Sequence, residues 1–216
     1  MPSSHPHSLA DLAFLGSILS KDPRPPAALL VSGPLTNAFQ NFPVPGLGLA
    51  PVATIFLVFS KAAAVDSFKM MCAIQTGTRQ ANGTYVLDGT RTDLCYTGTE
   101  VTPNRAIGLN SYGSGFWTFN ANLANSRVVL LTAKLYNNTI NNNLQLWLNG
   151  QLQNLSLYPG GLPPRTWSDT FTLGGDTNSS YTWQGTIYHA RVYLDDLTDP
   201  YRAEIEQVLL ASYPIS

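Results

Sequence analysis

The stretch Leu144-Gln-Leu-Trp-Leu-Asn-Gly150 decides the fold class, because it reads as a β-strand with leucine at every second position that ends in a tight turn. Strand signals with glycine turns follow it at Phe171-Thr-Leu-Gly-Gly175, Trp183-Gln-Gly-Thr-Ile-Tyr188 and Val192-Tyr-Leu194. Short strands separated by turn signals every ten or so residues are typical of a two-sheet sandwich. The sequence therefore predicts an all-β fold.

Further strand signals extend outward from this stretch. In the hairpin around Asn149-Gly150, the alternate leucines take one face, while Trp147 and Leu152 take the other. The run Thr54-Ile-Phe-Leu-Val-Phe-Ser60 is almost entirely apolar and rich in β-favouring residues, which indicates a strand at the centre of the sandwich. The other predicted strands cover residues 105–109, 116–120, 127–135, 143–148, 151–157, 170–173 and 185–194.

A second long hairpin is predicted around a type I′ turn at Asn82-Gly83. Its register puts Cys72 opposite Asp93 and Cys95 opposite Met70, so the cysteines are diagonal neighbours with Cα atoms about 7–8 Å apart. That distance exceeds the usual reach of a disulfide, and the sequence predicts two free thiols. Bulges at two glycines would shift this register: Gly77 and Gly89.

The N-terminal part of the chain lacks this strand pattern. Ser8 predicts a cap for a short helix over Leu9 to Leu19, and Asp22-Pro-Arg-Pro-Pro26 ends that helix because proline lacks the amide hydrogen. From Ala27 to Pro51, repeated prolines and glycines predict an irregular arm with one edge strand at most. We therefore expect a helix and a proline-rich arm over residues 1–51, and the sandwich over residues 52–216.

A C-terminal helix is predicted after the last strand. Asp199 serves as its cap and Pro200 as its first residue. An apolar stripe at helical spacing is expected to pack against the edge of the sandwich: Tyr201, Ile205, Val208 and Leu209.

The chain resembles the laminin-G and concanavalin A-like lectin/glucanase domains through the order of its motifs. These motifs are Val128-Val-Leu-Leu-Thr-Ala133, Leu146-Trp-Leu-Asn-Gly150, Leu173-Gly-Gly175, Gly185-Thr-Ile-Tyr188 and the closing helix. The resemblance covers residues 54–214. It implies a two-sheet antiparallel jelly roll whose rim loops or concave face bind sugars, proteins or calcium. Similar domains also occur in bacteriophages, as capsid decoration, virion-surface and tail components.

The composition narrows the classes of partner. Charged residues make up 12% of the chain, against roughly 25% in an average domain, and the formal net charge is −1. Nucleic-acid binding needs clustered lysine and arginine, so none is expected. A neutral surface rich in amides and hydroxyls suits either sugar recognition or close packing against neighbouring subunits.

No targeting segment or membrane-inserted segment is predicted. The first residues lack lysine and arginine, and Asp11 interrupts the apolar stretch, which argues against a signal peptide. The longest apolar run, from Ala50 to Phe59, is shorter than the roughly 20 residues that span a bilayer. We expect synthesis in a host cytoplasm and assembly into a virion.

Catalysis is not expected from the residues present. Glucanases of the resembled superfamily carry paired carboxylates in a Glu-x-Asp-x-x-Glu strand motif, and this motif is absent here. Serine or cysteine catalysis needs a positioned base. The only histidine within the predicted sandwich is His189, which lies in an alternating strand and is expected to be structural.

The best candidate ligand site is the rim loop over residues 174–183. It combines aromatic rings with amide and carboxylate groups, as sugar sites do: Asp176, Asn178, Tyr181 and Trp183. Further aromatic candidates are Trp167, Tyr112 and Trp117. In the alternative interpretation, Trp183 packs as core, and Asp176 and Asn178 only close the loop. Oxygens of the same two residues are candidate calcium ligands, and no other cofactor or metal is expected.

Two functions from different classes stay open. The first is a structural or adhesive virion component whose partners are other virion proteins or copies of itself. Its N-terminal arm would serve as the anchor, because proline pre-sets an extended chain and lowers the entropy lost on docking. The arm residues assigned to this role are Pro23, Pro25, Pro26, Phe39, Phe42, Pro43 and Pro45. The alternative is a lectin that binds cell-surface glycans through the rim loops.

Overall fold

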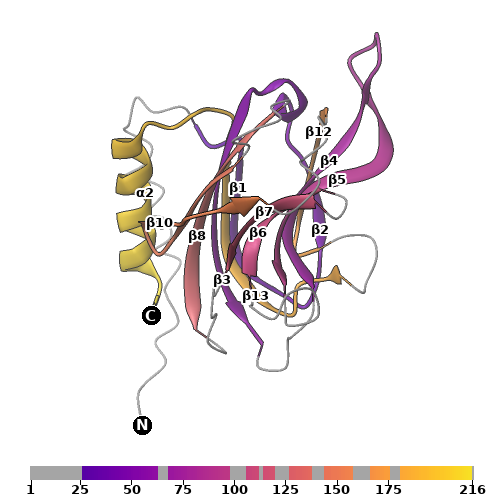
Figure 1. Cartoon of the computed structure of the whole chain (residues 1–216). Coiled ribbons are helices and arrows are strands. Elements are labelled where there is room, and N and C mark those ends of the chain that lie inside the picture. The colour runs from indigo at the N-terminus through magenta and orange to yellow at the C-terminus, as the bar shows by residue number, and fades with distance from the viewer. Residues whose placement is uncertain are drawn as a thin grey trace.

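The computed structural model of the chain describes residues 26–62, 68–97, 106–111, 114–119, 127–137, 144–157, 166–175 and 181–215. These residues form two antiparallel β-sheets that pack face to face, with one α-helix on the outside (Figure 1). The predicted all-β jelly-roll sandwich with a C-terminal helix is therefore confirmed. The predicted helix over Leu9 to Leu19 lies outside the described residues.

The two sheets differ by one strand. Sheet A has six strands, in the spatial order β1 (Leu29–Thr36), β13 (Gly185–Tyr193), β3 (Val52–Lys61), β8 (Val128–Tyr136), β9 (Leu144–Leu148) and β10 (Gln151–Leu152). Sheet B has seven, in the order β11 (Ser156–Leu157), β7 (Ser114–Phe119), β6 (Ala106–Ser111), β5 (Tyr85–Thr97), β4 (Lys69–Arg79), β12 (Trp167–Leu173) and β2 (Gln40–Pro43). The helices among the described residues are the short 3-10 helix η1 (Leu47–Leu49) and α2 (Asp199–Ser212).

The strand β3 runs through the middle of sheet A and is buried along its whole length. Its alternate side chains enter two separate cores. Ile55, Leu57 and Phe59 belong to the main core between the sheets, whereas Phe56 and Val58 belong to a second core beneath α2. Each such buried side chain stabilises the fold by about 1.5–3 kcal/mol. The apolar run predicted at the sandwich centre therefore connects all three layers.

The helix α2 lies over the outer face of sheet A (Figure 1). The prediction that it packs against the edge of the sandwich is therefore wrong. Ile205 and Leu209 are buried against that face, but Tyr201 is 41% exposed, so only part of the predicted apolar stripe is covered. Thr198 is the residue that caps the helix, one position before the predicted cap, and Pro200 lies in its first turn. No helix among the described residues is long and apolar enough to cross a membrane.

The stretch from Ala27 to Pro51 contributes strands to both sheets. β1 pairs with β13 at one edge of sheet A, and β2 pairs with β12 at one edge of sheet B. The prediction of an irregular arm before a sandwich that starts at residue 52 is therefore wrong for this stretch. An edge strand uses one side of its backbone only, so it tolerates Pro34 at a bulge and Pro43 at its end.

The two predicted hairpin turns differ in geometry. Asn149 and Gly150 both have left-handed φ angles, 50° and 79°, so the tight turn predicted there between β9 and β10 is of type I′. In the long hairpin of β4 and β5, only Gly83 is left-handed, with φ 86°, and its amide donates to the carbonyl of Gln80. The predicted type I′ turn at Asn82-Gly83 is therefore wrong, although the hairpin itself forms.

The register of that hairpin separates the two cysteines. Cys95 lies opposite Met70, as predicted, but Cys72 lies opposite Leu94 because the register shifts at two bulges, one of them next to Gly77. Cys72 therefore enters the main core, and Cys95 lies on the other side of sheet B beside Met70. Both thiols are free, as predicted, but they are not diagonal neighbours on one face.

Candidate functional site

The candidate site lies where the end of β12 meets the start of β13 and the connection between β1 and β2. Gly174 has φ 79°, and a Cβ atom there would lie 2.2 Å from the carbonyl oxygen of Ala38. Glycine thus permits the β1–β2 connection to approach the end of β12. The Gly174 amide donates to the Met71 carbonyl at 2.7 Å, and its carbonyl accepts from the Trp183 amide at 2.8 Å. The predicted Leu-Gly-Gly motif therefore builds this rim.

Trp183 forms a fixed wall of the site. Its side chain is 1% exposed, and its Nε1 donates to the carbonyl oxygen of Ser60 at 3.1 Å. Its ring meets Phe59 edge-on, with the ring centroids 5.3 Å apart. Gly185 permits this packing, because a Cβ atom there would lie 2.1 Å from the Ser60 carbonyl oxygen. Trp183 is thus packed as core, which is one of the two alternatives that the sequence left open.

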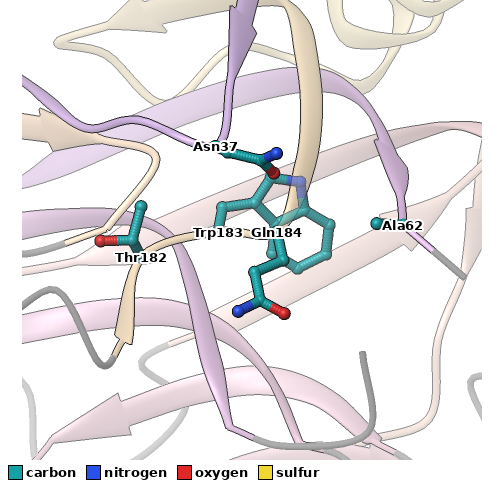
Figure 2. Close-up of a pocket in the computed structure, with 5 residues that line it drawn as sticks. All are labelled: Asn37, Ala62, Thr182, Trp183 and Gln184. Carbon is teal, nitrogen blue, oxygen red and sulfur yellow. The ribbon is translucent and has the colours of Figure 1, made fainter. Parts of the chain in front are cut away.

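A cavity of about 410 Å³ opens beside Trp183 (Figure 2). We call it the rim pocket, and its described lining residues are Asn37, Ala62, Thr182, Trp183 and Gln184. The volume falls within the roughly 300–1,000 Å³ of small-molecule sites. In Figure 2 the carboxamides of Asn37 and Gln184 project on opposite sides of the Trp183 ring.

Asn37 is held rigidly by the backbone of β13. It has a left-handed φ of 48°, a conformation that asparagine tolerates better than most residues. Its backbone amide donates to the Gly185 carbonyl at 3.1 Å, and its Oδ1 accepts from the Gly185 amide at 2.9 Å. The carbonyl end of the side chain is therefore used by the fold, and the Nδ2 end stays at the pocket.

Three polar groups of the rim pocket have no hydrogen-bond partner among the described residues. They are Nδ2 of Asn37, the hydroxyl of Thr182 and the carboxamide of Gln184. Hydroxyls and amides can both donate and accept hydrogen bonds at an open cavity. The pocket can therefore bind a ligand that carries several neutral polar groups.

Tyr181 supplies an exposed aromatic ring one position before Thr182, which lines the rim pocket. The side chain is 36% exposed, and its ring meets Phe68 edge-on at 5.5 Å between centroids. The guanidinium carbon of Arg91 lies 6.0 Å from the ring centroid, and Arg91 Nε lies 3.0 Å from the carboxylate of the buried Asp93. The Tyr181 ring is thus oriented by sheet B while it still faces solvent.

Of the other predicted ligand residues, the structure describes Trp167 and the backbone of Trp117. Trp167 is 2% exposed and belongs to the main core at the opposite end of β12. Trp117 lies in β7, paired with Gly108 of β6 and Ser156 of β11. The remaining predicted ligand residues lie outside the described residues: Tyr112, Asp176 and Asn178.

The residues assigned to the assembly arm lie in different surroundings. Phe42 packs against the main core, and Pro43 pairs with Thr170 in sheet B. Phe39 is 38% exposed. The prolines Pro26 and Pro45 are exposed, while Pro23 and Pro25 lie outside the described residues. An anchoring role for these residues stays a prediction.

His189 lies on the outer face of sheet A and is 6% exposed. Its Nδ1 is 3.4 Å from the hydroxyl of Tyr213, at the end of α2. Burial, and secondarily the charge of Arg191, lower the pKa of His189 to about 4. The imidazole is therefore a neutral, packed group at ordinary pH, which agrees with the structural role expected from the sequence.

The described residues include neither a reactive thiol nor a group of side chains that could hold a metal ion. Burial, and secondarily the charge of Asp93, raise the pKa of the Cys72 and Cys95 thiols, which keeps both protonated. Within the described ranges, no three His, Cys, Asp or Glu side chains gather into a group that could hold a metal ion. The predicted calcium ligands lie outside those ranges, so calcium binding stays a prediction.

Of the five described residues that line the rim pocket, sequence reasoning names only Trp183 as a candidate, although Thr182 lies within the predicted rim loop. Asn37 belongs to a segment that reads as an irregular arm, and Ala62 carries no chemical signal. Thr182 and Gln184 flank Trp183 in the sequence, and their adjacency to a buried tryptophan in a predicted rim loop is the one signal that points to them.

Comparison with known proteins gives no match in sequence and clear matches in structure. No family model matches the chain, and no curated protein matches it. The carbohydrate-binding module CBM40 of the Ruminococcus gnavus IT-sialidase, bound to α2,3-sialyllactose, superposes with a TM-score of 0.57 and 15% identity. That match covers 84% of this chain and 99% of the module. The chain shares its fold with that module.

Larger proteins contain the same fold. The intramolecular trans-sialidase of leech matches with a TM-score of 0.53 and 17% identity over 84% of this chain, but this chain spans only 28% of that protein. A SAP-like pentraxin from Limulus polyphemus matches with a TM-score of 0.50 and 9% identity, over 73% of this chain and 70% of the pentraxin. At these identities the likeness shows the fold alone, and it agrees with the jelly roll that the sequence resemblance implies.

Proposed function

We propose that this chain is a non-catalytic carbohydrate-binding domain that holds a glycan at the rim pocket and against Tyr181. The observation that carries this proposal is the cavity of about 410 Å³, where three neutral polar groups have no partner among the described residues, together with the exposed ring of Tyr181 one position before the lining residue Thr182. Sugars have apolar ring faces and hydroxyl-bearing edges. Sites that combine a few convergent polar groups with aromatic surface suit both features.

The structural comparisons support the same class of function. Two of the superposed structures are of a carbohydrate-binding module that holds α2,3-sialyllactose or α2,6-sialyllactose, and each match covers 84% of this chain. The match extends over 99% to 100% of the module, so the sandwich as a whole corresponds to one binding unit. The proposal that the chain binds without catalysis follows the class of these modules.

The alternative of a virion component has less support. Residues 29–36 and 40–43, which the sequence analysis assigned to an anchoring arm, pair with strands of the chain's own sheets. The backbone hydrogen-bonding groups on one side of each of these two strands are therefore already bonded within the chain's own sheets. The three structures described above are a sialidase module, a sialidase and a pentraxin. Virion assembly stays a hypothesis without an observation that favours it.

A glycan array probed with the whole chain tests the proposal. We expect binding to at least one glycan class, and we expect Tyr181→Ala to weaken that binding roughly 5- to 30-fold, because an aromatic contact of about 1–2 kcal/mol is lost. The matched control is Tyr201→Ala, since Tyr201 is 41% exposed on α2. Its affinity is expected to equal that of the wild type. The proposal is wrong if no glycan binds, or if both variants lose affinity equally.

A further inference from the structure

The rim pocket contains no charged side chain among its described lining residues. Its polar groups are two carboxamides and one hydroxyl, and Ala62 and Trp183 supply the apolar part of the wall (Figure 2). Carboxamides and hydroxyls exchange hydrogen bonds with the hydroxyl, ether and acetamido groups of a sugar. They do not neutralise a carboxylate or a sulfate.

Two cations next to residues of the rim in sequence or space, Lys61 and Arg91, already have partners in the fold. Lys61 precedes Ala62 but is 3% exposed, and its Nζ lies 5.7 Å from the ring centroid of Tyr96 and 3.4 Å from the Ala62 carbonyl oxygen. Arg91 lies behind Tyr181, with Nε 3.0 Å from the carboxylate of Asp93. Both positive charges are therefore engaged by groups of the fold, and the Lys61 ammonium is buried.

Arg127 is exposed, but β3 separates it from the pocket. Arg127 directly precedes β8, which pairs with one edge of β3 through Val128 and Ser60. The pocket adjoins the other edge of β3, where Gly185 pairs with Lys61. An acidic group placed in the pocket would lose hydration without a facing counter-charge among the described lining residues, and such desolvation is unfavourable.

We infer that the rim pocket selects a neutral sugar, a pyranose with hydroxyl or acetamido groups and without a carboxylate or sulfate. This inference rests on the proposed glycan-binding function and specifies its ligand class. It separates this chain from the superposed module that holds sialyllactose, because sialic acid carries a carboxylate.

Asn37 presents a hydrogen-bond donor to the pocket, so it favours a ligand atom that accepts. Its Oδ1 is fixed by the Gly185 amide at 2.9 Å, so the side chain presents its Nδ2 hydrogens and not an acceptor to the pocket. A hydroxyl, ring or acetamido oxygen of a neutral sugar accepts such a bond. Asn37→Asp keeps the acceptor for Gly185 and tolerates the left-handed φ, but it replaces the donor by a negative charge. We expect it to weaken binding of the neutral sugar at least about 5-fold without loss of folding.

Matched glycan pairs test the inference on the whole chain. The array carries each neutral glycan beside its sialylated and its sulfated derivative, with lactose and sialyllactose as one pair. We expect the neutral member to bind at least about 10-fold more tightly, with an affinity that changes less than about 2-fold between low and high salt, since screening acts on charges. Tighter binding of the acidic members, or a steep salt dependence, overturns the inference and leaves the glycan-binding proposal intact. Absence of binding to every glycan overturns both.

A charge substitution at the pocket supplies an independent arm of the test. Gln184→Lys adds a cation, which the described lining residues do not include, at an exposed position of the pocket, and Tyr201→Lys places the same charge on α2 as the matched control. We expect Gln184→Lys to shift the preference at least about 5-fold toward the acidic member of each pair, and Tyr201→Lys to leave it unchanged. An unchanged preference in both variants means that ligand charge is not read at this pocket, and it overturns the inference.

Discussion

The layer beneath α2 and the rim pocket hold their polar side chains in opposite ways. Beneath α2, charged side chains are buried and matched: Arg202 pairs with Glu206, and the Arg202 guanidinium lies 4.2 Å from the ring centroid of Trp147. Lys134 of the same face lies 2.8 Å from the carboxylate of Asp196. At the rim pocket, the polar groups are neutral, and three of them have no partner among the described residues.

This difference distinguishes polar groups that stabilise the fold from polar groups that are available to a ligand. A buried charge is stable only when a partner compensates its lost hydration, so the cluster under α2 has little left to offer a ligand. A neutral amide or hydroxyl at a cavity tolerates an unoccupied state, because water can bind to it. The rim pocket therefore has the properties of a binding site, and the charged cluster those of a helix-docking surface.

Trp183→Ala has the largest expected effect, because Trp183 belongs to both the main core and the rim pocket. The free energy of unfolding is expected to fall by about 3–5 kcal/mol, measured by denaturant titration. Tyr181→Ala, two positions away at an exposed site, is the control and is expected to cost less than about 1 kcal/mol. Equal losses of stability in the two variants would contradict the distinction between a buried Trp183 that stabilises the core and an exposed Tyr181 that does not.

Glu206→Leu tests whether the charges beneath α2 stabilise only as a pair. The single variant leaves the Arg202 charge buried without its partner, and we expect a loss of about 3 kcal/mol in the free energy of unfolding. The double variant Arg202→Met/Glu206→Leu removes both charges and is expected to recover most of that loss. A double variant as unstable as the single one would contradict a compensated pair and indicate a role in cavity filling alone.

The pH dependence of stability tests the neutral state of His189. Its pKa is lowered from 6.5 to about 4 in the folded chain, so the folded state binds fewer protons than the unfolded state between these values. Its contribution is present above pH 6.5 and is lost as pH falls toward 4, by up to about 3 kcal/mol. The variant His189→Gln lacks this titration. The difference between wild type and variant, measured by denaturant unfolding across pH 7 to 4, is expected to shrink as pH falls, and a constant difference would contradict the assignment.

Gln184→Ala has the smallest expected effect on folding, and it tests whether a polar group of the rim pocket serves binding without serving stability. Gln184 is exposed and has no partner among the described residues, so the free energy of unfolding should change by less than about 0.5 kcal/mol. Glycan affinity is nevertheless expected to fall several-fold in titration calorimetry. A loss of stability comparable to that of Glu206→Leu would place Gln184 among the structural polar groups.

The fold was more accessible to sequence reasoning than the site, for physical reasons. The run from Thr54 to Ser60 and the turn at Asn149-Gly150 are local signals, since apolar patterning and left-handed φ depend on neighbouring residues. The sequence predicts at most one edge strand where β1 and β2 form, because their prolines are tolerated only at the sheet edges, and edge position is a property of the whole sandwich.

The rim pocket depends on contacts between distant parts of the chain. Asn37 meets Gly185 across almost 150 positions in sequence, and Gly174 admits the backbone of Ala38. Neither contact can be predicted from the residues that neighbour it in the sequence. Tyr181 and Trp183 were predictable as aromatic residues of a rim loop, but their division into an exposed ring and a buried wall follows from packing against Phe68 and Phe59.

The most direct test of a glycan site at the rim pocket is backbone amide NMR of the whole chain during titration with a glycan that binds on the array. If the glycan binds at the rim pocket, the largest chemical-shift changes fall on Ala62, Thr182 and Gln184, and the amides of α2, residues 199–212, stay unchanged. Shift changes concentrated on α2 or on the tip of the β4–β5 hairpin, with the rim amides unmoved, would contradict binding there.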